Sequence, residues 1–454
     1  MKKKKIIFFE LNEVPLRIFE ESFKYLSYKS KLSDFNFLPT IVRDNGHLSP
    51  WTTWSTVHRG VLFSDHQIGD LGQNITKVNE KYPPIWITLK EKGLSVGVFG
   101  SLHSSQLSPN VYSKYSFYIP DVFSTHNDCY PDSFRSLQKL NLYLSRKSAR
   151  VVRNVLPSPS LFLKSVFSYF ITSFSVSTCL KISWQLVDEI LFPWKKIRRR
   201  TIQSDILFDG YFKFLKKKKP NFSTFFTNHV ASSMHRFWEA SFPKDYKKLP
   251  HKKSWINRYK NEIKLAMKST SKYINKLTEF VDKNPDYELW IISSMGQAAC
   301  EGYTPQKQFW FIKNLKTFVE SIVGEQCEIY QGPAMVPLYS VCGDEEIIER
   351  IKSCFKKLST NASFKIRTTT PRSISFYFHS IEDNIYLKKD NQILITKGLE
   401  LIPINEHTSS SAYHVPEGIF YRYGKSVSDI DKNLLVNGKL PIDLIKNLIL
   451  NEEM

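Results

Sequence analysis

The sequence has few cysteines, and none of them form paired metal or redox ligands. Six cysteines are spread over 454 residues, at positions 129, 179, 300, 327, 342 and 354, without a Cys-x-x-Cys pair. This spacing argues against a zinc ribbon, a thioredoxin-like motif and a disulfide framework. We therefore expect reduced thiols and a cytoplasmic location.

The sequence also lacks an apolar run long enough to cross a bilayer, which takes about 20 residues. The nearest candidate, LFLKSVFSYFITSFSVSTCLKISW (161–184), is interrupted by Lys164 and Lys181 and is rich in Ser and Thr. The N-terminal apolar stretch after MKKKK is too short for a signal peptide. A basic run, KKIRRR (195–200), follows the candidate segment. This region is interpreted either as a helical cap or as a peripheral contact with the anionic inner face of a membrane.

Acidic residues are in the minority. The chain has 43 Asp and Glu against 64 Lys and Arg, a net charge of +21. That balance favours acidic partners. The sequence has no zinc-finger spacing, RRM-like aromatic motif or Gly-rich RNA clamp, which argues against nucleic acid. We expect a phosphorylated small molecule or glycan instead.

Hydrophobic residues make up 42% of the chain, enough for a large core. Four short apolar runs have the length of buried strands: KIIFFEL (5–11), SVGVFGS (95–101), FSTFFTN (222–228) and ELWIISS (288–294). Helical patterns lie between them, for example over 84–93 and 254–282. Strands that alternate with helices predict an α/β fold: a doubly wound, mostly parallel sheet with helices on both faces.

The alternation breaks in two places, which predicts a helical insertion and a small α/β subdomain. We divide the chain into the first part of the core, a basic and partly apolar helical insertion, the second part of the core, the subdomain, and the C-terminal part of the core. Their ranges are 1–105, 106–215, 216–315, 316–399 and 400–454.

Polar side chains follow the predicted strands. Glu10 and Asn12 come at the end of the first strand, Asn228 and His229 at the end of the third, and Ser294 after the fourth. In open α/β sheets, ligand sites form at the carboxyl ends of the strands. We therefore expect these residues near one site.

Several segments, in this order, resemble the alkaline phosphatase superfamily on its nucleotide pyrophosphatase/phosphodiesterase and phosphomutase side. IIFFELNEVP resembles the first strand, which in the family ends in a metal-binding Asp. LSPWTTWSTVHRG (48–60) resembles the turn and helix that carry a nucleophilic Thr or Ser. The later segments are IWITLKEKGLSVGVFGS (85–101), TNHVASSMHRFW (227–238), IISSMGQ (291–297) and HVPEGIFYRYG (414–424).

The resemblance implies phosphate-ester chemistry with metal ions, but the ligand set is altered. The family's Asp-His pair is replaced by Ser294-Met295, and the Asp four residues before His235 is Ala231. The first-strand Asp corresponds to Glu10, or is shifted to Asn12 or Glu13. His235 and His414 match the family's histidines. We expect one divalent metal, zinc by preference, bound by His229, His235 and His414, with the second site doubtful.

The remaining candidate residues surround that metal. Thr53, or else Thr52, is the expected nucleophile at the start of a helix, with Glu10 as a ligand or base. Four residues are candidates for substrate binding: Asn228, Ser294, Gln297 and His58. The structural alternatives are helix capping for the threonines and hydrogen-bonded core positions for the histidines.

The resemblance implies a phosphoester or phosphodiester hydrolase or transferase. The expected substrate is a phosphorylated sugar or a nucleotide-linked or lipid-linked intermediate, with surface-polysaccharide assembly as a setting by analogy. The alternative is a pseudoenzyme of the same fold that binds an anionic glycan, nucleotide or membrane partner without turnover. The missing Asp-His pair motivates that alternative.

Overall fold

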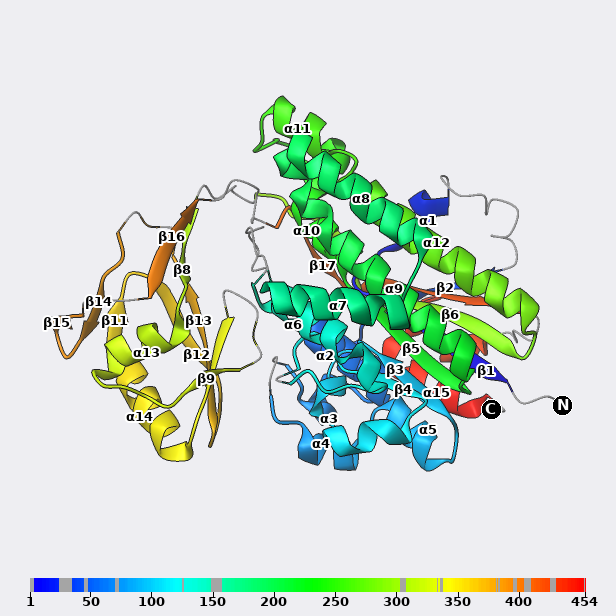
Figure 1. The fold of residues 1–454 in the computed structure, drawn as a ribbon, viewed down its shortest axis with the longest axis horizontal. Coiled ribbons are helices and arrows are strands. Elements are labelled where there is room, and N and C mark those ends of the chain that lie inside the picture. Colours follow the sequence, from blue (N-terminus) through cyan, green and yellow to red (C-terminus); the bar gives the residue numbers. More distant parts are fainter. Residues whose placement is uncertain are drawn as a thin grey trace.

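A central eight-stranded sheet organises the chain in the computed structural model (Figure 1). The model describes residues 4–23, 35–44, 48–69, 73–124, 126–147, 157–302, 308–332, 334, 338–380, 382, 384–394, 398–403, 410–424, 430–452 and 454. The strand order is β19-β2-β18-β6-β1-β5-β3-β4. Its strands are β1 (Lys5–Leu11), β2 (Phe35–Ile41), β3 (Val96–Phe99), β4 (Phe117–Ile119), β5 (Phe222–Thr227), β6 (Tyr287–Ser293), β18 (Glu417–Tyr423) and β19 (Leu440–Pro441).

The sheet is mostly parallel, as predicted. Strands β6, β1, β5, β3 and β4 run parallel to one another. Strand β18 runs antiparallel between β6 and β2. The carboxyl ends of β1, β5, β3 and β4 consequently meet at one edge, where β1 leads directly into residues 12–15.

Strand β1 is buried on both faces because helices cover both sides of the sheet. Ile7 and Phe9 pack in one hydrophobic cluster, with α1 (Leu16–Phe23), α9 (Arg199–Lys218), α10 (His229–Ser241) and α12 (Glu262–Lys283). Ile6 and Phe8 pack in the other, with α2 (Pro50–Arg59), α5 (Ile85–Glu91) and α15 (Ile445–Asn451). The alternation along β1 thus places successive side chains in opposite layers, and the prediction of helices on both faces is confirmed.

The segment between β4 and β5 is largely helical. It contains α6 (Arg135–Lys147), α7 (Pro159–Thr172), α8 (Val176–Leu191) and α9. Two short helices, α3 (Phe63–His66) and α4 (Thr76–Lys81), follow α2. Among the described helices, none combines the length and the apolar character that a bilayer crossing requires.

The single helix predicted over 254–282 is two helices. The structure has α11 (Lys253–Tyr259) and α12, separated at Lys260 and Asn261. The break accompanies an ion pair, because Arg198 Nη2 donates to Oε1 of buried Glu262 at 2.7 Å. A tertiary contact of this kind overrides the helical pattern of the sequence.

A small unit with its own hydrophobic cluster forms a lobe beside the main sheet (Figure 1). It spans residues 308–403, because β8 pairs with β16. Its elements are β8 (Gln308–Ile312), α13 (Leu315–Val323), β9 (Tyr330–Gln331), β10 (Leu338–Cys342), α14 (Glu345–Lys356), β11 (Leu358–Thr360), β12 (Ser363–Thr370), β13 (Ser373–His379), β14 (Leu387–Lys389), β15 (Gln392–Ile393) and β16 (Leu399–Pro403). A separate pair, β7 (Gly296–Ala299) and β17 (Ala412–Val415), lies antiparallel, with His414 opposite Gln297.

Candidate metal centre and adjoining pocket

Three side chains from distant parts of the sequence converge at the carboxyl end of β1. Glu13 follows β1, His235 lies on α10 after β5, and His414 lies on β17. His235 Nε2 is 2.9 Å from Glu13 Oε2, and His414 Nε2 is 3.2 Å from the same oxygen. One ligand atom from each residue lies within 4.8 Å of the others, so the group could hold a metal ion.

Hydrogen bonds fix the orientation of both histidine rings. His235 Nδ1 donates to the Ala412 carbonyl at 2.9 Å, and His414 Nδ1 donates to the Leu48 carbonyl at 2.8 Å. A carbonyl oxygen only accepts, so each Nδ1 carries a hydrogen and each neutral ring keeps its lone pair on Nε2. Such contacts orient imidazoles that bind metals through Nε2.

The Glu13 carboxylate favours a positive charge at the centre of the group. Burial alone would raise the pKa of the Glu13 carboxyl, but the charges of His235 and His414 lower that pKa well below its usual range. An ionised carboxylate facing two imidazole lone pairs would be repelled by them. Either protons on the rings or a metal ion must therefore lie between these atoms. Two nitrogens and one carboxylate oxygen suit zinc with a position left open.

Glu13 occupies an unusual backbone conformation. Its φ is +59°, in the left-handed region that residues other than glycine rarely adopt. Neighbours hold the buried carboxylate there: Asn12 Nδ2 donates to Oε1 at 2.8 Å, and Gln297 Nε2 donates to Oε2. Strained backbone of this kind tends to occur at functional sites. Gln297, expected at the substrate, is thus placed beside the carboxylate.

Asn12 connects the group to two other elements. Its Nδ2 also donates to Asn228 Oδ1 at 2.7 Å, and its Oδ1 accepts from Trp54 Nε1 at 2.8 Å. Asn228 is exposed at the start of α10, so its side chain remains accessible to a ligand.

The threonine candidates lie in the first turn of α2. Thr53 Oγ1 is 2.9 Å from Ser294 Oγ and also donates to the Ser49 carbonyl at 3.2 Å. Thr52 is buried, and its carbonyl accepts from Thr56 Oγ1. The structure therefore brings Thr53 and Ser294 together in one buried contact.

Glu10 and His58 pair with each other rather than with the Glu13 group. His58 Nε2 is 2.6 Å from Glu10 Oε1, and Ser101 Oγ donates to Glu10 Oε2 at 2.7 Å. Both partners of the pair are 0% exposed. The alternation of β1 turns Glu10 toward the α2 layer, whereas Glu13 lies beyond the end of the strand.

His229 is not brought to His235 and His414. Its Nδ1 is 2.6 Å from Thr227 Oγ1, and its Nε2 is 3.1 Å from the Ala266 carbonyl. Burial lowers the pKa of His229 to about 4. The predicted set of three histidines is therefore corrected: Glu13 takes the third position in the group. The sequence had offered Glu13 only as an alternative match for the first-strand Asp.

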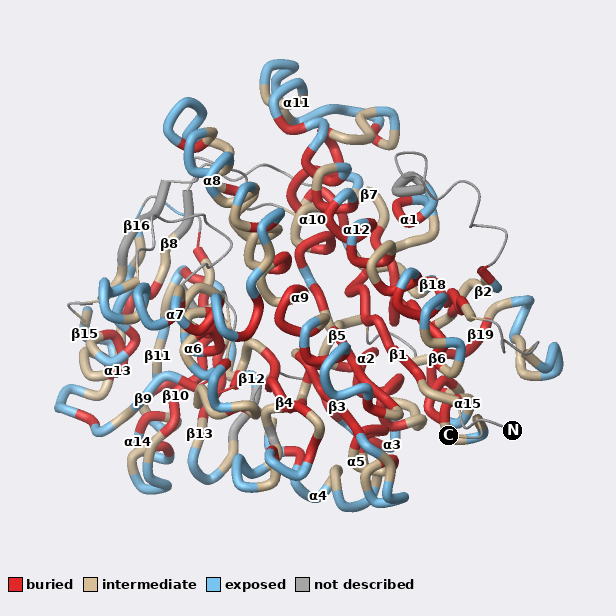
Figure 2. The backbone as a smooth tube through the Cα atoms, turned by 45° about the vertical axis from the view of Figure 1, so that its right-hand side comes forward, coloured by how far each residue is buried: buried red, intermediate tan, exposed pale blue. Residues whose placement is uncertain are grey.

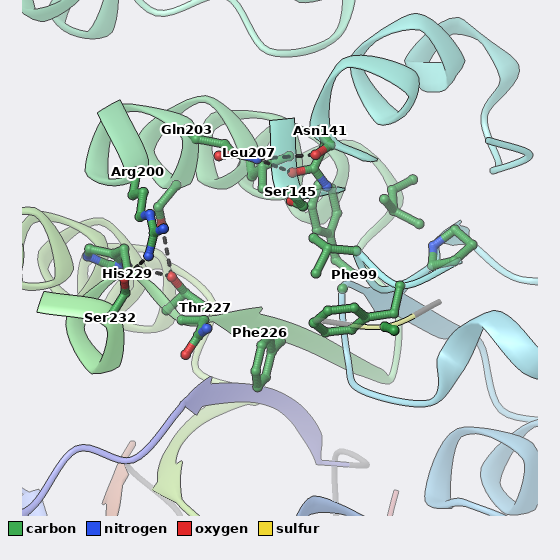
Figure 3. Close-up of a pocket in the computed structure, with 18 residues that line it drawn as sticks. Phe99, Asn141, Ser145, Arg200, Gln203, Leu207, Phe226, Thr227, His229 and Ser232 are labelled. Carbon is green, nitrogen blue, oxygen red and sulfur yellow. Dashed lines mark hydrogen bonds between the residues drawn. The ribbon is translucent and has the colours of Figure 1, made fainter. Parts of the chain in front are cut away.

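A pocket of about 180 Å³ adjoins this centre at Asn228 (Figure 3). Its walls come from the carboxyl ends of β3, β4 and β5 and from α6 and α9. Figure 3 shows Arg200 directed toward Ser232 and Thr227; Arg200 Nη1 donates to Ser232 Oγ. Phe99, Phe226 and Leu207 form part of the apolar wall. Sequence patterns did not identify Arg200, because only tertiary packing places α9 over β5.

The sequence matches no model of a known protein family, and no curated protein matches it. Solved structures do resemble it in fold. Phosphonoacetate hydrolase from Sinorhizobium meliloti 1021, in complex with phosphonoformate, has 11% identity and a TM-score of 0.40, over 100% of this chain and 96% of the other. Human ectonucleotide pyrophosphatase/phosphodiesterase 5 has 10% identity and a TM-score of 0.38, over 98% and 94%. A variant of TAB5 alkaline phosphatase with Mg bound has 9% identity and a TM-score of 0.39, over 100% and 99%.

Proposed function

We propose that the chain is a phosphoester hydrolase or phosphotransferase that uses one divalent cation. The observation that supports this most is the Glu13, His235 and His414 group, in which both Nδ1 atoms donate to backbone carbonyls. The order of sequence segments that resemble the alkaline phosphatase superfamily supports phosphate esters as the substrate class.

A divalent cation in this group would polarise a phosphoryl oxygen and lower the pKa of a bound water. The protein's own residues have separate tasks. Glu13 contributes the negative charge of the group, and Asn12 and Gln297 keep its carboxylate in place. Asn228, exposed at the pocket, is positioned to hydrogen-bond a phosphoryl oxygen. Arg200 supplies the pocket's positive charge: burial lowers its pKa only to about 10, so it stays protonated at neutral pH.

Thr53 remains the preferred nucleophile for a transfer reaction, with Thr52 as the alternative. Ser294 would orient the Thr53 hydroxyl through their 2.9 Å contact. The substrate is a phosphorylated sugar or a nucleotide-linked or lipid-linked intermediate, and surface-polysaccharide assembly remains the proposed setting. We place the protein in the cytoplasm, with peripheral contact to the inner membrane face.

Metal content and turnover test the proposal together. Protein purified without chelators or a His-tag is analysed by mass spectrometry, with His235→Ala and His251→Ala compared. His251 is the matched control, because its Nδ1 contacts Glu239, which is not a member of the group. Two results together would support the proposal. The wild type and His251→Ala should carry one metal per chain that His235→Ala lacks, and the wild type should turn over members of a panel of phosphodiesters and sugar nucleotides. No metal under any loading condition would refute it.

A pseudoenzyme is the second candidate, and one observation favours it. Apart from Glu13, the side chains that Asn12 contacts are neutral: Asn228 supplies an amide and Trp54 an indole. Thr53 and Ser294, which contact each other, supply only hydroxyls. Such groups bind oxyanions but are poor ligands for a second zinc ion. Tight binding of a phosphate ester without turnover, unchanged by added metal, would favour this candidate.

A further inference from the structure

Helices α7 and α8 expose an apolar face of unusual extent. Trp184 is 71% exposed, Ile190 79% and Phe167 69%. Of the 20 large apolar side chains that are exposed in the described part of the chain, 14 belong to this face, which we call the α7–α8 face. They are Phe162, Leu163, Phe167, Phe170, Ile171, Phe174, Val176, Leu180, Trp184, Leu186, Val187, Ile190, Leu191 and Phe192. Figure 2 colours much of α8 as exposed. Exposed apolar side chains gathered on two successive helices in this number indicate an interaction site.

Lysines border the face. Lys164 lies on α7 itself, and Lys213, on α9, donates to the carbonyl of Ile171 at the end of α7. Exposed lysines continue to the end of α9 at positions 216–219. On the side of α12, Lys268 and Lys272 are exposed. Partial burial and the nearby charge of Lys181 lower the pKa of Lys272, so several positive charges lie close together there.

This combination fits an anionic lipid bilayer better than a second copy of the chain. Apolar side chains enter the acyl boundary while lysines reach anionic headgroups. Two copies that met through this face would bring their lysines toward each other. The helices are too short or too polar to span the bilayer, so the contact is peripheral.

An apolar groove adjoins both helix α8 and the pocket beside the metal centre. Asn141 and Gln203 line both cavities and are joined by a hydrogen bond, in which Gln203 Nε2 donates to Asn141 Oδ1 at 2.6 Å. The groove, also of about 180 Å³, lies between α6, α8 and α9. Its apolar lining is Leu137, Leu140, Leu144, Ile182, Leu186, Ile202 and Ile206. It shares Asn141, Gln203 and Leu207 with the pocket that contains Arg200 and Asn228. Helix α8 therefore contributes both to the groove wall and to the exposed face.

We propose that the substrate is a phosphoester carried by a lipid, and that the α7–α8 face rests on the anionic bilayer that holds it. The hydrocarbon chain occupies the groove between α6, α8 and α9, and the phosphate lies between Arg200 and the metal centre. This assignment rests on the proposed phosphoester function and selects the lipid-linked class among its substrates.

Vesicle flotation tests the membrane contact without any need for turnover. Vesicles of phosphatidylcholine alone are compared with vesicles that also contain phosphatidylglycerol. The face variant carries Phe167→Ser, Trp184→Ser and Ile190→Ser; the control variant carries Leu249→Ser, Ile393→Ser and Val436→Ser, exposed apolar residues elsewhere. We expect the wild type and the control to float with the anionic vesicles, and the face variant to bind at least about tenfold more weakly.

Two results would overturn the bilayer contact. One is a wild type that stays unbound to both vesicles. The other is a face variant that floats as well as the control. Gel filtration without lipid tests whether a second copy of the chain covers the face instead. If the wild type is a dimer and the face variant is a monomer, a second copy covers the face and the bilayer assignment is wrong.

Calorimetry tests the substrate class. Long-chain lysophosphatidic acid and glycerol 3-phosphate share the phosphate and differ in the hydrocarbon chain. We expect the lipid to bind at least about tenfold more tightly, and Ile206→Trp, which fills the groove, to remove that difference. Equal binding of the two by the wild type would overturn the lipid assignment. A wild-type protein that binds no metal or shows no turnover would instead refute the proposed function. The bilayer contact would still stand, because vesicle flotation needs neither metal nor turnover.

Discussion

The carboxylates of Glu13 and Glu10 provide a matched pair for testing the metal centre. Both are buried at the end of β1, and both contact a histidine, but only Glu13 belongs to the group with two inward-facing Nε2 atoms. Glu13→Gln keeps the shape of the side chain and its hydrogen-bonding capacity while removing its charge. Glu10→Gln makes the same chemical change three residues away.

The magnitude follows from the geometry. At an effective dielectric constant of about 20, the Glu13 carboxylate and a unit positive charge about 3 Å away attract by about 6 kcal/mol before desolvation. Desolvation offsets part of this, and breaking a buried charged pair costs about 3–5 kcal/mol net. For a cation held beside Glu13, that loss corresponds to roughly 10²–10⁴-fold weaker binding.

The assay is zinc affinity by competition with a chelator, together with metal content per folded chain after gel filtration. We expect Glu13→Gln to lose stoichiometric metal while it remains folded. Glu10→Gln should lose about 1–3 kcal/mol of unfolding free energy, because it weakens the buried hydrogen bonds of this side chain with His58 and Ser101, yet the folded fraction should keep its metal. If Glu10→Gln loses metal and Glu13→Gln retains it, the assignment of the carboxylates is wrong.

Three further predictions follow from the described contacts. The pKa of His229 is lowered from 6.5 to about 4 by burial, so the unfolded chain binds a proton at this histidine before the folded chain does as the pH falls. The stability that neutral His229 contributes to the folded state, about 3 kcal/mol, is therefore fully present above about pH 6.5 and is lost as the pH falls toward 4. His229→Gln should therefore flatten this part of the stability profile in urea unfolding, and an unchanged profile would contradict it. Ile274→Ala, at a fully buried position of α12, should cost about 2–5 kcal/mol without changing metal content; loss of metal would show that the centre depends on that packing. Thr53→Ala should abolish transfer while Thr53→Ser retains most of it, measured by phosphate release; equal rates in both variants would exclude Thr53 as the nucleophile.

The layered sheet could be predicted from sequence because each strand carries its own signal. KIIFFEL is short, apolar and bounded by polar residues, and both faces of β1 are indeed buried. The chain's helical breaks were harder to foresee. The pattern over 254–282 continues through Asn261, and only the contact of Glu262 with Arg198 reveals why α12 begins where it does.

The candidate site was predictable in part. His235 and His414 were identified, and the structure brings them together. His229 lies six residues before His235 on the same helix, and at about 100° per residue the two side chains point roughly 120° apart. One site could not take both. Glu13 could not be assigned to the group from sequence, because its position depends on a left-handed backbone conformation. Local sequence preferences argue against that conformation at a residue other than glycine.

The three residues of the candidate metal centre come from distant parts of the chain, which has a consequence for biosynthesis. Glu13 emerges from the ribosome long before His414, so the centre cannot assemble until β17 has been made. Strand β18, which fills the place between β6 and β2, follows His414 directly. Until it inserts, the edge of β6 has no partner on that side, and exposed strand edges favour aggregation. Metal retention would thus report that β17 has been made and has joined the rest of the centre, and chains truncated before β17 should be both metal-free and prone to aggregate.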